Sequence, residues 1–352
     1  MYTTIKDKRV PIWQEEQTKN RIWTVVVVLA AIIILATLYT HFHVENRQDW
    51  YIAVKEQRPD SELMLTSPDV KLKEIVCKTH HDVCYYILDS DYGSLNQLRR
   101  LHIEPQHHTI LCGALIDEKG KIIPEHMWMT YTRLALQAPF LFGIFKSGQK
   151  SRVLQIGLGG GVSGAFLEWL PEKHDITTVE LEPVVVHIAK RWYNVPFTDH
   201  HRIVVGDGFQ FVHERADSAP KYDFAFVDTS YEDDFHLMMS PVAIFSRDEF
   251  ATNLRKHMNS EGCAVAVNTY THHRELDKLL DSEKFRHDML LTYRKYYETC
   301  FFVETGANNI LMCSCKSFGH EMTQLGYEKL LKEIPSDIQQ KLKVKYLVRS
   351  DW

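Results

Sequence analysis

Short apolar runs alternate with longer amphipathic stretches after residue 150, and this alternation predicts an α/β fold. Each apolar run ends near a glycine or an acidic residue, and the stretch behind it has the spacing of a helix. Strands that alternate with helices build a mostly parallel sheet. The predicted strands cover 152–156, 176–181, 202–205, 222–227 and 262–268, and the predicted helices cover 162–170, 183–192, 208–215, 247–258 and 274–284.

The segments on both sides of this region have other patterns. Residues 71–123 consist of short alternating runs broken by turn residues, which predicts a small antiparallel β module. Residues 124–142 follow as a predicted helix, with Pro124 near its start and Pro139 near its end. Residues 291–303 and 309–315 predict a closing antiparallel pair of strands, and residues 322–343 predict one or two surface helices.

An uninterrupted apolar segment lies near the start of the chain. No charged residue falls between Arg21 and Glu45, so the segment can cross the roughly 30 Å hydrocarbon layer of a membrane. Trp23 and Tyr39 lie where interfacial aromatic residues are expected. The apolar core is longer than that of a cleaved signal peptide, and no small-residue cleavage site follows it. We therefore predict an uncleaved, single-pass transmembrane helix over 22–42.

The side of the membrane on which the main domain lies stays open. Lys and Arg are more frequent before the span than after it, which predicts a cytosolic N-terminus and a lumenal or external main domain. No Asn-x-Ser/Thr motif for N-glycosylation follows the span, and this argues against a lumenal or external main domain. Cys77 and Cys84 fit either a small disulfide loop or two free thiols. The predicted segments are a polar tail at 1–21, the transmembrane helix at 22–42, a stem at 43–70, the β module at 71–123, a cofactor-binding domain at 124–316 and a helical segment at 317–352.

Composition narrows the functional classes. The chain has 352 residues, of which 45% are hydrophobic, so it can bury a full core. Its net charge of -5 gives no basic footprint for nucleic acid, and we exclude that partner. Seven scattered cysteines do not form the dense pattern of a disulfide scaffold. The His-His pairs have no partners at metal-ligand spacing, so we predict no metal site.

The glycine cluster behind the run 152–156 predicts a cofactor-binding turn. The sequence Gly157-Leu158-Gly159-Gly160-Gly161 separates a predicted strand from a predicted helix. Glycine permits the positive φ and the close backbone approach that such a turn needs, and the helix N-terminus supplies unpaired N–H groups. We assign Gly157, Gly159 and Gly161 to the binding of a nucleotide cofactor.

Acidic residues end the next three strands, and the carboxyl ends of parallel strands meet at one edge of a sheet. Glu180 lies roughly 20 residues beyond the glycines, where such folds bind ribose hydroxyls; the alternative is an exposed acid. Asp207, followed by Gly208, is expected to contact the exocyclic amine of an adenine or else to cap a turn. Asp228 would accept a proton from an amine beside the cofactor, or cap the following turn.

Further motifs separate the enzyme classes. Glu232, Asp233 and Asp234 either attract a cationic substrate or form a solvated loop. No Gly-x-Ser-x-Gly elbow and no Walker-type motif is present, so hydrolase and NTPase functions lose support. A dinucleotide dehydrogenase would share the glycine turn and Glu180. The acid between two glycines at 206–208, together with Asp228, instead favours a cofactor with an adenosine and a short charged tail.

At these residues the sequence resembles the class I S-adenosylmethionine-binding fold, in its spermidine synthase-like branch. The matching motifs are 156–161, 179–180, 206–208 and 228–230. The closer resemblance is to the C-terminal domain of the methyltransferase-like proteins that methylate elongation factor 1-alpha, and it covers residues 70–316. The resemblance implies a seven-stranded Rossmann-like sheet behind the β module, S-adenosyl-L-methionine as cofactor, and homodimers that pair through the β module.

The sequence departs from the polyamine synthases of that branch at several positions. Those enzymes carry an Asp inside the glycine turn, where this chain has Gly160, and a second acid after the catalytic Asp, where it has Tyr231. Their Tyr-His-Glu run aligns best with Tyr131-Thr132-Arg133. A buried diamine needs carboxylates to pair its charges. The departures therefore favour methyl transfer over aminopropyl transfer.

We predict a membrane-anchored, S-adenosylmethionine-dependent methyltransferase that acts on an amine of a protein. The alternatives are a spermidine synthase-like aminopropyltransferase and a scaffold that has kept the fold but lost catalysis. The predicted catalytic residue is Asp228, and the predicted cofactor-binding residues are Gly157, Gly159, Gly161, Glu180, Asp207, Gly208 and Asp228.

Overall fold

The computed structural model describes most of the chain after residue 50. Residues 51–352 form one unit, and the predicted tail at 1–21 and transmembrane helix at 22–42 lie outside the described residues. Within the described part, no helix is both long and apolar enough to cross a membrane. The described ranges are 51–54, 69–78, 83–93, 96–104, 110–195, 198–214, 221–233, 236–271, 276–306, 308–318 and 322–349.

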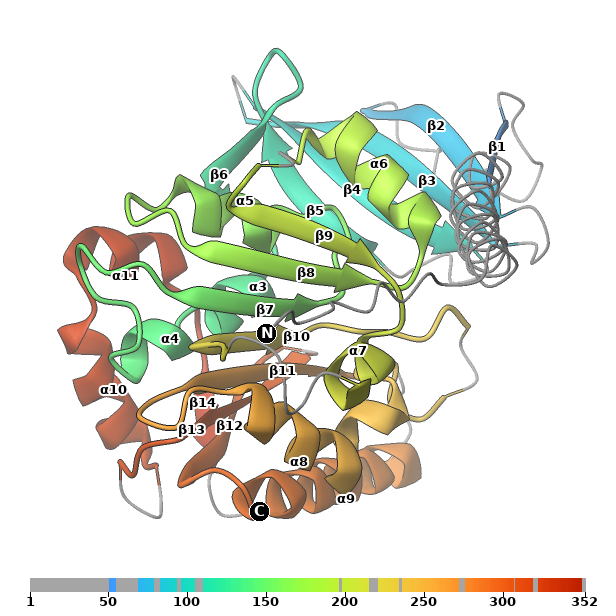
Figure 1. Cartoon of the computed structure of the whole chain (residues 1–352). Coiled ribbons are helices and arrows are strands. Elements are labelled where there is room, and N and C mark those ends of the chain that lie inside the picture. Colours follow the sequence, from blue (N-terminus) through green and yellow to red (C-terminus); the bar gives the residue numbers. More distant parts are fainter. Residues whose placement is uncertain are drawn as a thin grey trace, which may run out of the picture. The chain divides into compact units, whose positions relative to one another are not determined.

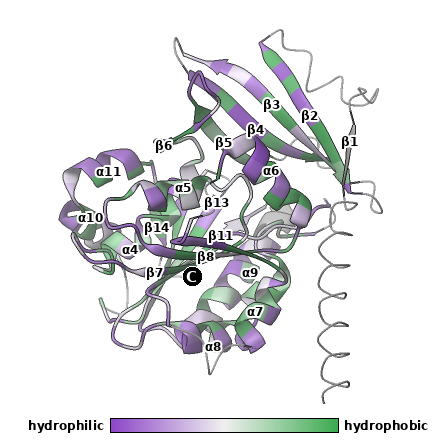
Figure 2. Ribbon diagram, turned by 45° about the horizontal axis from the view of Figure 1, so that its top comes forward, coloured by the Kyte–Doolittle hydropathy of each residue, from purple (hydrophilic) through white to green (hydrophobic). Residues whose placement is uncertain are grey.

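The N-terminal part of this unit is a six-stranded antiparallel sheet with its strands in sequence order (Figure 1). Hydrophobic and hydrophilic residues alternate along the first half of β2, where neighbouring side chains point to opposite faces (Figure 2), whereas the first six residues of β3 are all buried. The sheet begins inside the predicted stem and extends beyond the predicted module at 71–123. Its strands are β1 (Tyr51–Val54), β2 (Val70–Lys78), β3 (Cys84–Tyr92), β4 (Asn96–Glu104), β5 (Ile110–Ile116) and β6 (Ile122–Met127).

The single helix predicted over 124–142 is wrong. Its first residues belong to β6, and two short helices follow, α3 (Thr130–Ala135) and α4 (Ala138–Leu141). Pro124 cannot donate a backbone hydrogen bond, but β6 is an edge strand, where proline is tolerated. Pro139 lies in the first turn of α4, where its missing N–H costs nothing.

The second half of the chain forms an eight-stranded mixed sheet, which confirms the predicted α/β fold. Its strand order is β14-β12-β13-β11-β10-β7-β8-β9. The eighth strand, β14, comes from the segment predicted to be helical at 317–352. Five strands are parallel and three are antiparallel: β7 (Arg152–Ile156), β8 (Asp175–Glu180), β9 (His201–Val205), β10 (Phe224–Val227) and β11 (Ala264–Tyr270), then β12 (Thr299–Thr305), β13 (Asn308–Ser314) and β14 (Leu347–Arg349).

Two hydrophobic cores pack against opposite faces of this mixed sheet. Successive strand residues alternate between them, so Val153 and Phe224 face one core and Leu154 and Ala225 face the other. The first core is shared with the six-stranded sheet, α3 and α5, and the second lies between the sheet and α7, α8 and α9 (Figure 1). The remaining helices are α5 (Val162–Trp169), α6 (Pro183–Tyr193), α7 (Gly208–Glu214), the 3-10 turn Ala243–Ser246, α8 (Asp248–His257), α9 (Leu276–Arg294), α10 (Gln324–Glu333) and α11 (Ser336–Leu342).

The strand predicted over 291–303 is wrong in its first half, because α9 continues to Arg294 and β12 begins at Thr299. Met289, Leu290 and Tyr293 are all buried in the second core. Their spacing of one and three residues places them on one face of a helix. An apolar run that reads as a strand in isolation is therefore the buried stripe of a long helix.

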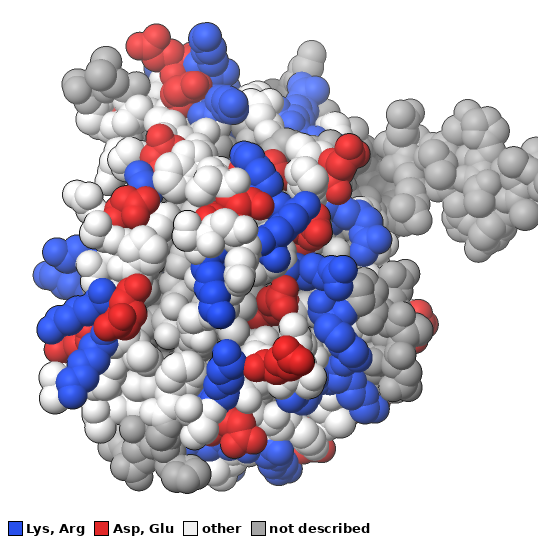
Figure 3. All heavy atoms as spheres, turned by 60° about the vertical axis from the view of Figure 1, so that its left-hand side comes forward, with Lys and Arg blue, Asp and Glu red and all other residues white. Residues whose placement is uncertain are grey.

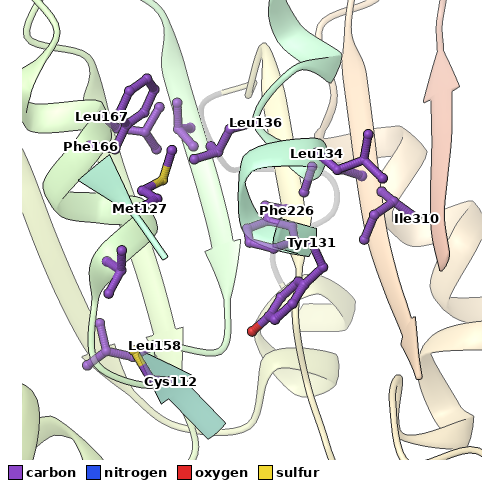
Figure 4. Packing of buried hydrophobic residues seen from close by; sticks show 14 of the residues in the cluster. Cys112, Met127, Tyr131, Leu134, Leu136, Leu158, Phe166, Leu167, Phe226 and Ile310 are labelled. Atoms are coloured by element: carbon purple, nitrogen blue, oxygen red, sulfur yellow. The ribbon is translucent and has the colours of Figure 1, made fainter. Parts of the chain in front are cut away.

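Helix α3 connects the two sheets from inside the first core (Figure 4). Tyr131 and Leu134 of α3 lie in the same buried cluster as Phe226 of β10 and Ile310 of β13. The cluster also contains Cys112 of β5. The packing of α3 thus holds the six-stranded sheet over the mixed sheet and places Tyr131 near the ends of the parallel strands.

Three disulfides join six of the seven cysteines. Cys77–Cys84 links the facing ends of β2 and β3, which decides between the two alternatives left open by the sequence. The other two disulfides, Cys300–Cys313 and Cys263–Cys315, staple β12, β13 and the start of β11. Cys313 and Cys315, two residues apart in the chain, therefore belong to two different disulfides. Cys112 is free and buried.

Charges of both signs are mixed on the surface that Figure 3 shows. Lys and Arg side chains lie next to Asp and Glu side chains there, and uncharged areas separate the groups. Within the described residues, no group of three or more potential ligands could hold a metal ion.

A buried ion pair ties the six-stranded sheet to α6. Arg99 of β4 donates from Nε and from Nη2 to the two carboxylate oxygens of Asp89 in β3, each over 2.7 Å. Its remaining nitrogen, Nη1, donates to the backbone carbonyl of Trp192 in α6. Asp89 is 3% and Arg99 is 6% exposed. Loss of either partner would leave an uncompensated buried charge.

We expect Asp89→Asn to lower the free energy of unfolding by about 3–5 kcal/mol, because Arg99 would keep its charge without a carboxylate. Urea denaturation of the two proteins measures the difference. The matched control is Asp288→Asn, which breaks the exposed pair between Lys284 and Asp288 and should change stability by less than about 0.5 kcal/mol. Equal effects of the two substitutions would contradict the structural role of the Arg99–Asp89 pair.

Candidate active site

A pocket of ≈ 670 Å³ opens at the carboxyl edge of the parallel strands. The chain runs from β7 outward to β8 and β9 on one side, and β10 and β11 lie on the other, so the order of strands reverses between β7 and β10. Ligands of open α/β sheets bind at such a reversal, outside the carboxyl ends. The pocket is lined by residues at or just beyond the carboxyl ends of β7, β8, β9, β10 and β11, and residues of the six-stranded sheet form its other wall.

The predicted glycine turn forms one side of the pocket. Gly157, Gly159 and Gly161 have φ of 96°, 51° and 72°, a region that other residues rarely adopt. A Cβ atom on Gly157 would lie 2.0 Å from the backbone oxygen of Asp228, so only glycine lets the turn approach the end of β10. Gly157 and Gly159 line the pocket, whereas Gly161 begins α5 behind it. Gly208 also lines the pocket, and a Cβ there would lie 2.3 Å from Ile156.

Glu180 organises this turn as well as lining the pocket. The side chain is 8% exposed, so it is not the exposed strand-end acid of the alternative interpretation. Its Oε2 accepts a hydrogen bond from the backbone N–H of Leu158 over 2.8 Å, and Oε1 accepts one from Glu182 over 2.9 Å. Burial raises the pKa of Glu180, and the two backbone N–H groups oppose this rise. Each oxygen retains a second lone pair for a ligand hydroxyl.

Asp207 caps a helix. Its Oδ1 accepts hydrogen bonds from the backbone N–H groups of Phe209 and Gln210, at 2.7 Å and 3.2 Å, at the start of α7. Of the two roles predicted for Asp207, these contacts show the capping role. Asp207 also lines the pocket, so contact with an adenine remains a prediction for its second oxygen.

Asp228 lies at the end of β10, where hydrogen bonds from two side chains fix its carboxylate. Asn268 of β11 donates from Nδ2 to Oδ1 over 2.8 Å, and the hydroxyl of Tyr131 in α3 donates to Oδ2 over 3.1 Å. Asn308 at the start of β13 in turn donates to Oδ1 of Asn268 over 3.0 Å. All four residues line the pocket. The contacts therefore hold Asp228 in place as a pocket carboxylate.

The pKa shifts at this carboxylate have clear causes. Burial raises the pKa of Asp228, and the hydrogen bonds from Asn268 and Tyr131 act in the opposite direction. Burial, together with the charge of Asp228, raises the pKa of Tyr131 well above its usual value, so the phenol stays protonated and donates. A carboxylate with a raised pKa is a stronger base than an exposed one. The site is thus suited to accept a proton.

The acidic loop behind Asp228 is held by the six-stranded sheet. Lys78, at the end of β2, lies 2.6 Å from Oε1 of Glu232 and 2.8 Å from Oε1 of Glu182. Tyr85 of β3 donates to the same Oε1 of Glu232 over 2.7 Å. Asp233 lies 3.4 Å from His236. Two of the three acids predicted to attract a cation thus have partners in the protein, and Asp234 lies outside the described residues.

Several residues of the site were not assigned a role from the sequence alone. In the sequence, Tyr131 is marked only by its alignment with the Tyr-His-Glu run, and no role is predicted for Asn268, Asn308, Lys78 or Tyr85. Asn268 follows the apolar run 264–267, so the rule that polar residues at strand ends build the site could have found it. Asn308 begins an antiparallel strand, and Lys78 belongs to the other sheet, so no local pattern marks them.

Comparison with known proteins supports the resemblance found in the motifs. No family model matches the chain. The polyamine aminopropyltransferase of Vibrio vulnificus (strain CMCP6) is 28% identical over 202 residues, which cover 54% of this chain and 60% of that enzyme. The eEF1A lysine and N-terminal methyltransferase of Mus musculus is 25% identical over 162 residues, which cover 46% of this chain and 22% of that protein. The aligned region is thus less than two thirds of each relative.

A solved structure supports the fold. A protein described as a probable spermidine synthase from Corynebacterium glutamicum ATCC 13032 superposes with a TM-score of 0.58 at 14% sequence identity. The match covers 80% of this chain and 91% of that one, so it includes both sheets. The predicted similarity to the methyltransferases of elongation factor 1-alpha and to the spermidine synthase-like branch is confirmed.

We expect Glu180→Ala to weaken S-adenosylmethionine binding by about 1–3 kcal/mol, because the substitution removes a charged acceptor from the pocket. Calorimetric titration measures the affinity. The control is Asp175→Ala, at the opposite end of the same strand, where the acid pairs with exposed Lys150. Binding by Glu180→Ala as tight as that of the Asp175→Ala control would remove Glu180 from the cofactor site.

Proposed function

We propose that the protein is an S-adenosylmethionine-dependent methyltransferase that acts on an amine, with Asp228 as the base. The observation that carries this proposal is the half-buried Asp228 carboxylate at the reversal of strand order, which Tyr131 and Asn268 fix and whose backbone packs against Gly157 of the glycine turn. The names of the relatives, an aminopropyltransferase and a methyltransferase of protein amines, support transfer to a nitrogen.

The residues of the pocket fit an S-adenosylmethionine molecule. Gly157 and Gly159 line the pocket at the carboxyl edge, and both have a positive φ that other residues rarely adopt. Glu180 would accept the ribose hydroxyls, and Asp207 with Gly208 would face the adenine. When bound, the cofactor supplies a methyl group on a positively charged sulfur. The pocket holds many carboxylates, which are suited to such a cation.

The chain's own groups prepare the acceptor. An alkyl ammonium is not a nucleophile, so it must lose a proton before its nitrogen can attack. Asp228 would take this proton, and its raised pKa favours the transfer. The freed nitrogen would then attack the methyl carbon, forming the N–C bond as the S–C bond breaks, and the sulfur would leave uncharged. Most of the remaining rate enhancement comes from holding the two reactants in line.

Aminopropyl transfer is the second candidate, because the Vibrio vulnificus relative carries that name. The surroundings of two residues, Gly160 and Tyr231, argue against aminopropyl transfer. A Cβ on Gly160 would lie 2.5 Å from Cys112 Sγ and 2.9 Å from the Tyr193 ring, so the acid of the polyamine synthases would not fit there. Tyr231, in place of their second acid, accepts a hydrogen bond from the backbone N–H of Ala243. A catalytically silent scaffold is the third candidate.

We also propose that residues 22–42 anchor the enzyme and that the enzyme domain lies on the oxidising side of the membrane. Three disulfides within the described residues support this side, because disulfides persist in the secretory pathway and outside the cell. The excess of Lys and Arg before the span agrees with it. Its protein acceptor would then be lumenal or external. Pairing of two copies through the six-stranded sheet remains a prediction.

We expect Asp228→Asn to bind S-adenosylmethionine like the wild type but to transfer methyl groups at least about 100-fold more slowly, because an amide cannot accept the proton. The assay follows a labelled methyl group from S-adenosylmethionine to n-hexylamine. Since only the carboxylate form acts, the wild-type rate should fall as the pH drops through the raised pKa of Asp228. Unchanged turnover in the variant would leave Asp228 with a structural role only.

We expect all six paired cysteines to resist alkylation in the native protein from cells and to react after reduction. Mass spectrometry of peptides under non-reducing conditions identifies the pairs, with Cys112 as the single thiol. A second test inserts an Asn-x-Thr acceptor into the exposed turn at 117–120. Glycosylation there would agree with a lumenal or external domain, whereas free thiols and no glycan would place the domain in the cytosol.

A further inference from the structure

The pocket has an unusual charge balance that bears on the acceptor. We propose that the acceptor carries one positive charge, on the reacting amine, followed by an apolar portion, and that Lys78 enforces this choice. The inference rests on the proposed function and names the substrate class of the same site.

Carboxylates are the only charged side chains among the described residues that line the pocket; Lys, Arg and His are absent from that lining. The six acids are Glu180, Glu182, Asp207, Asp228, Glu232 and Asp233. An anionic acceptor would be repelled by such a wall. A cationic acceptor is favoured, and the number of charges that it can carry depends on which acids still lack a partner.

Lys78 compensates two of these acids from behind the wall. Its ammonium bonds both oxygens of Glu232, at 2.6 Å and 2.8 Å, and one oxygen of Glu182 at 2.8 Å. The Lys78 side chain is only 9% exposed, so water screens these contacts weakly. The Lys78 ammonium therefore already neutralises Glu182 and Glu232, the two carboxylates that could otherwise pair with the second charge of a diamine.

Backbone groups and a histidine hold three of the remaining acids. Glu180 accepts two backbone N–H groups, and Asp207 accepts two at the start of α7. Asp233 lies 3.4 Å from His236. Under the proposed function Glu180 and Asp207 face the cofactor, whereas Asp228, whose donors Tyr131 and Asn268 are neutral side chains, lies beside the reacting amine. One carboxylate at the reaction centre thus remains for one substrate cation.

The wall contributed by the six-stranded sheet and the β6–α3 connection is apolar. Ile103, Ile110, Leu111, Trp128 and Met129 line it. Gly113 of β5 makes room for the Trp128 ring, since a Cβ there would lie 2.4 Å from its Cε3 atom. A second ammonium placed against this wall would be desolvated without a partner. A hydrocarbon or aromatic group would instead gain by its burial.

The experiment compares two amines that differ only in the second charge, n-hexylamine and 1,6-diaminohexane. The full chain is first saturated with S-adenosylhomocysteine, and each amine is titrated into it by calorimetry. We expect the monoamine to bind at least about tenfold more tightly, as the loss of one unpaired buried charge should allow. Equal or tighter binding of the diamine would overturn the inference.

Substitution of Lys78 tests its part in this choice. We expect Lys78→Met to reduce the preference for the monoamine by about tenfold, because Glu182 and Glu232 then have no internal cation. Lys78→Arg should retain the preference. The matched control is Lys150→Met, which removes a lysine that pairs with Asp175 at the amino-terminal edge of the mixed sheet, away from the pocket. An unchanged ratio in Lys78→Met would overturn the role of Lys78.

The design also separates this inference from the function on which it rests. If Lys78→Met fails to fold, Glu232→Gln offers a second variant, in which Lys78 keeps only Glu182 and should repel the diamine more strongly. Failure of the folded wild-type protein to bind S-adenosylhomocysteine would overturn the proposed function itself. Binding of the cofactor product together with a preference for the diamine would overturn only the inference about the acceptor.

Discussion

The close contact between Gly157 and Asp228 is the constraint on which the site depends. The backbone of Asp228 fills the space that a side chain at position 157 would need, and the Asp228 N–H donates to the carbonyl of Ile156 over 2.8 Å. The end of β10 is thereby locked against the turn that follows β7. A cofactor in the turn and an acceptor at the carboxylate would then be neighbours without any movement of the chain.

The opposite wall of the pocket depends on how the two sheets are joined. Arg99 and Asp89 fasten the six-stranded sheet to α6, and α3 packs between the sheets with Tyr131 pointing toward Asp228. Lys78 then reaches the loops behind β8 and β10. The small sheet is thus part of the candidate site, because it contributes the apolar wall, the compensating ammonium and Tyr85.

Hydrogen bonds and burial act against each other at the two key acids. Burial raises the pKa of Glu180 and of Asp228, while neighbouring donors stabilise their charged forms. The donors of Glu180 are backbone groups of the turn, which fits a residue that shapes the cofactor site. The donors of Asp228 are side chains from α3 and β11, which fits the role of base that we propose for this carboxylate.

The sequence by itself determined the α/β alternation, the glycine turn and the acids at the strand ends, because strand and helix periodicity and the φ of glycine are local properties. It could not determine that Pro124 lies in an edge strand or that 289–294 is helical, because partners distant in the chain decide both. Only the tertiary structure paired Cys300 with Cys313 and brought Lys78 to Glu182 and Glu232. Charge compensation depends on distances in space, and residues more than a hundred positions apart share no local pattern.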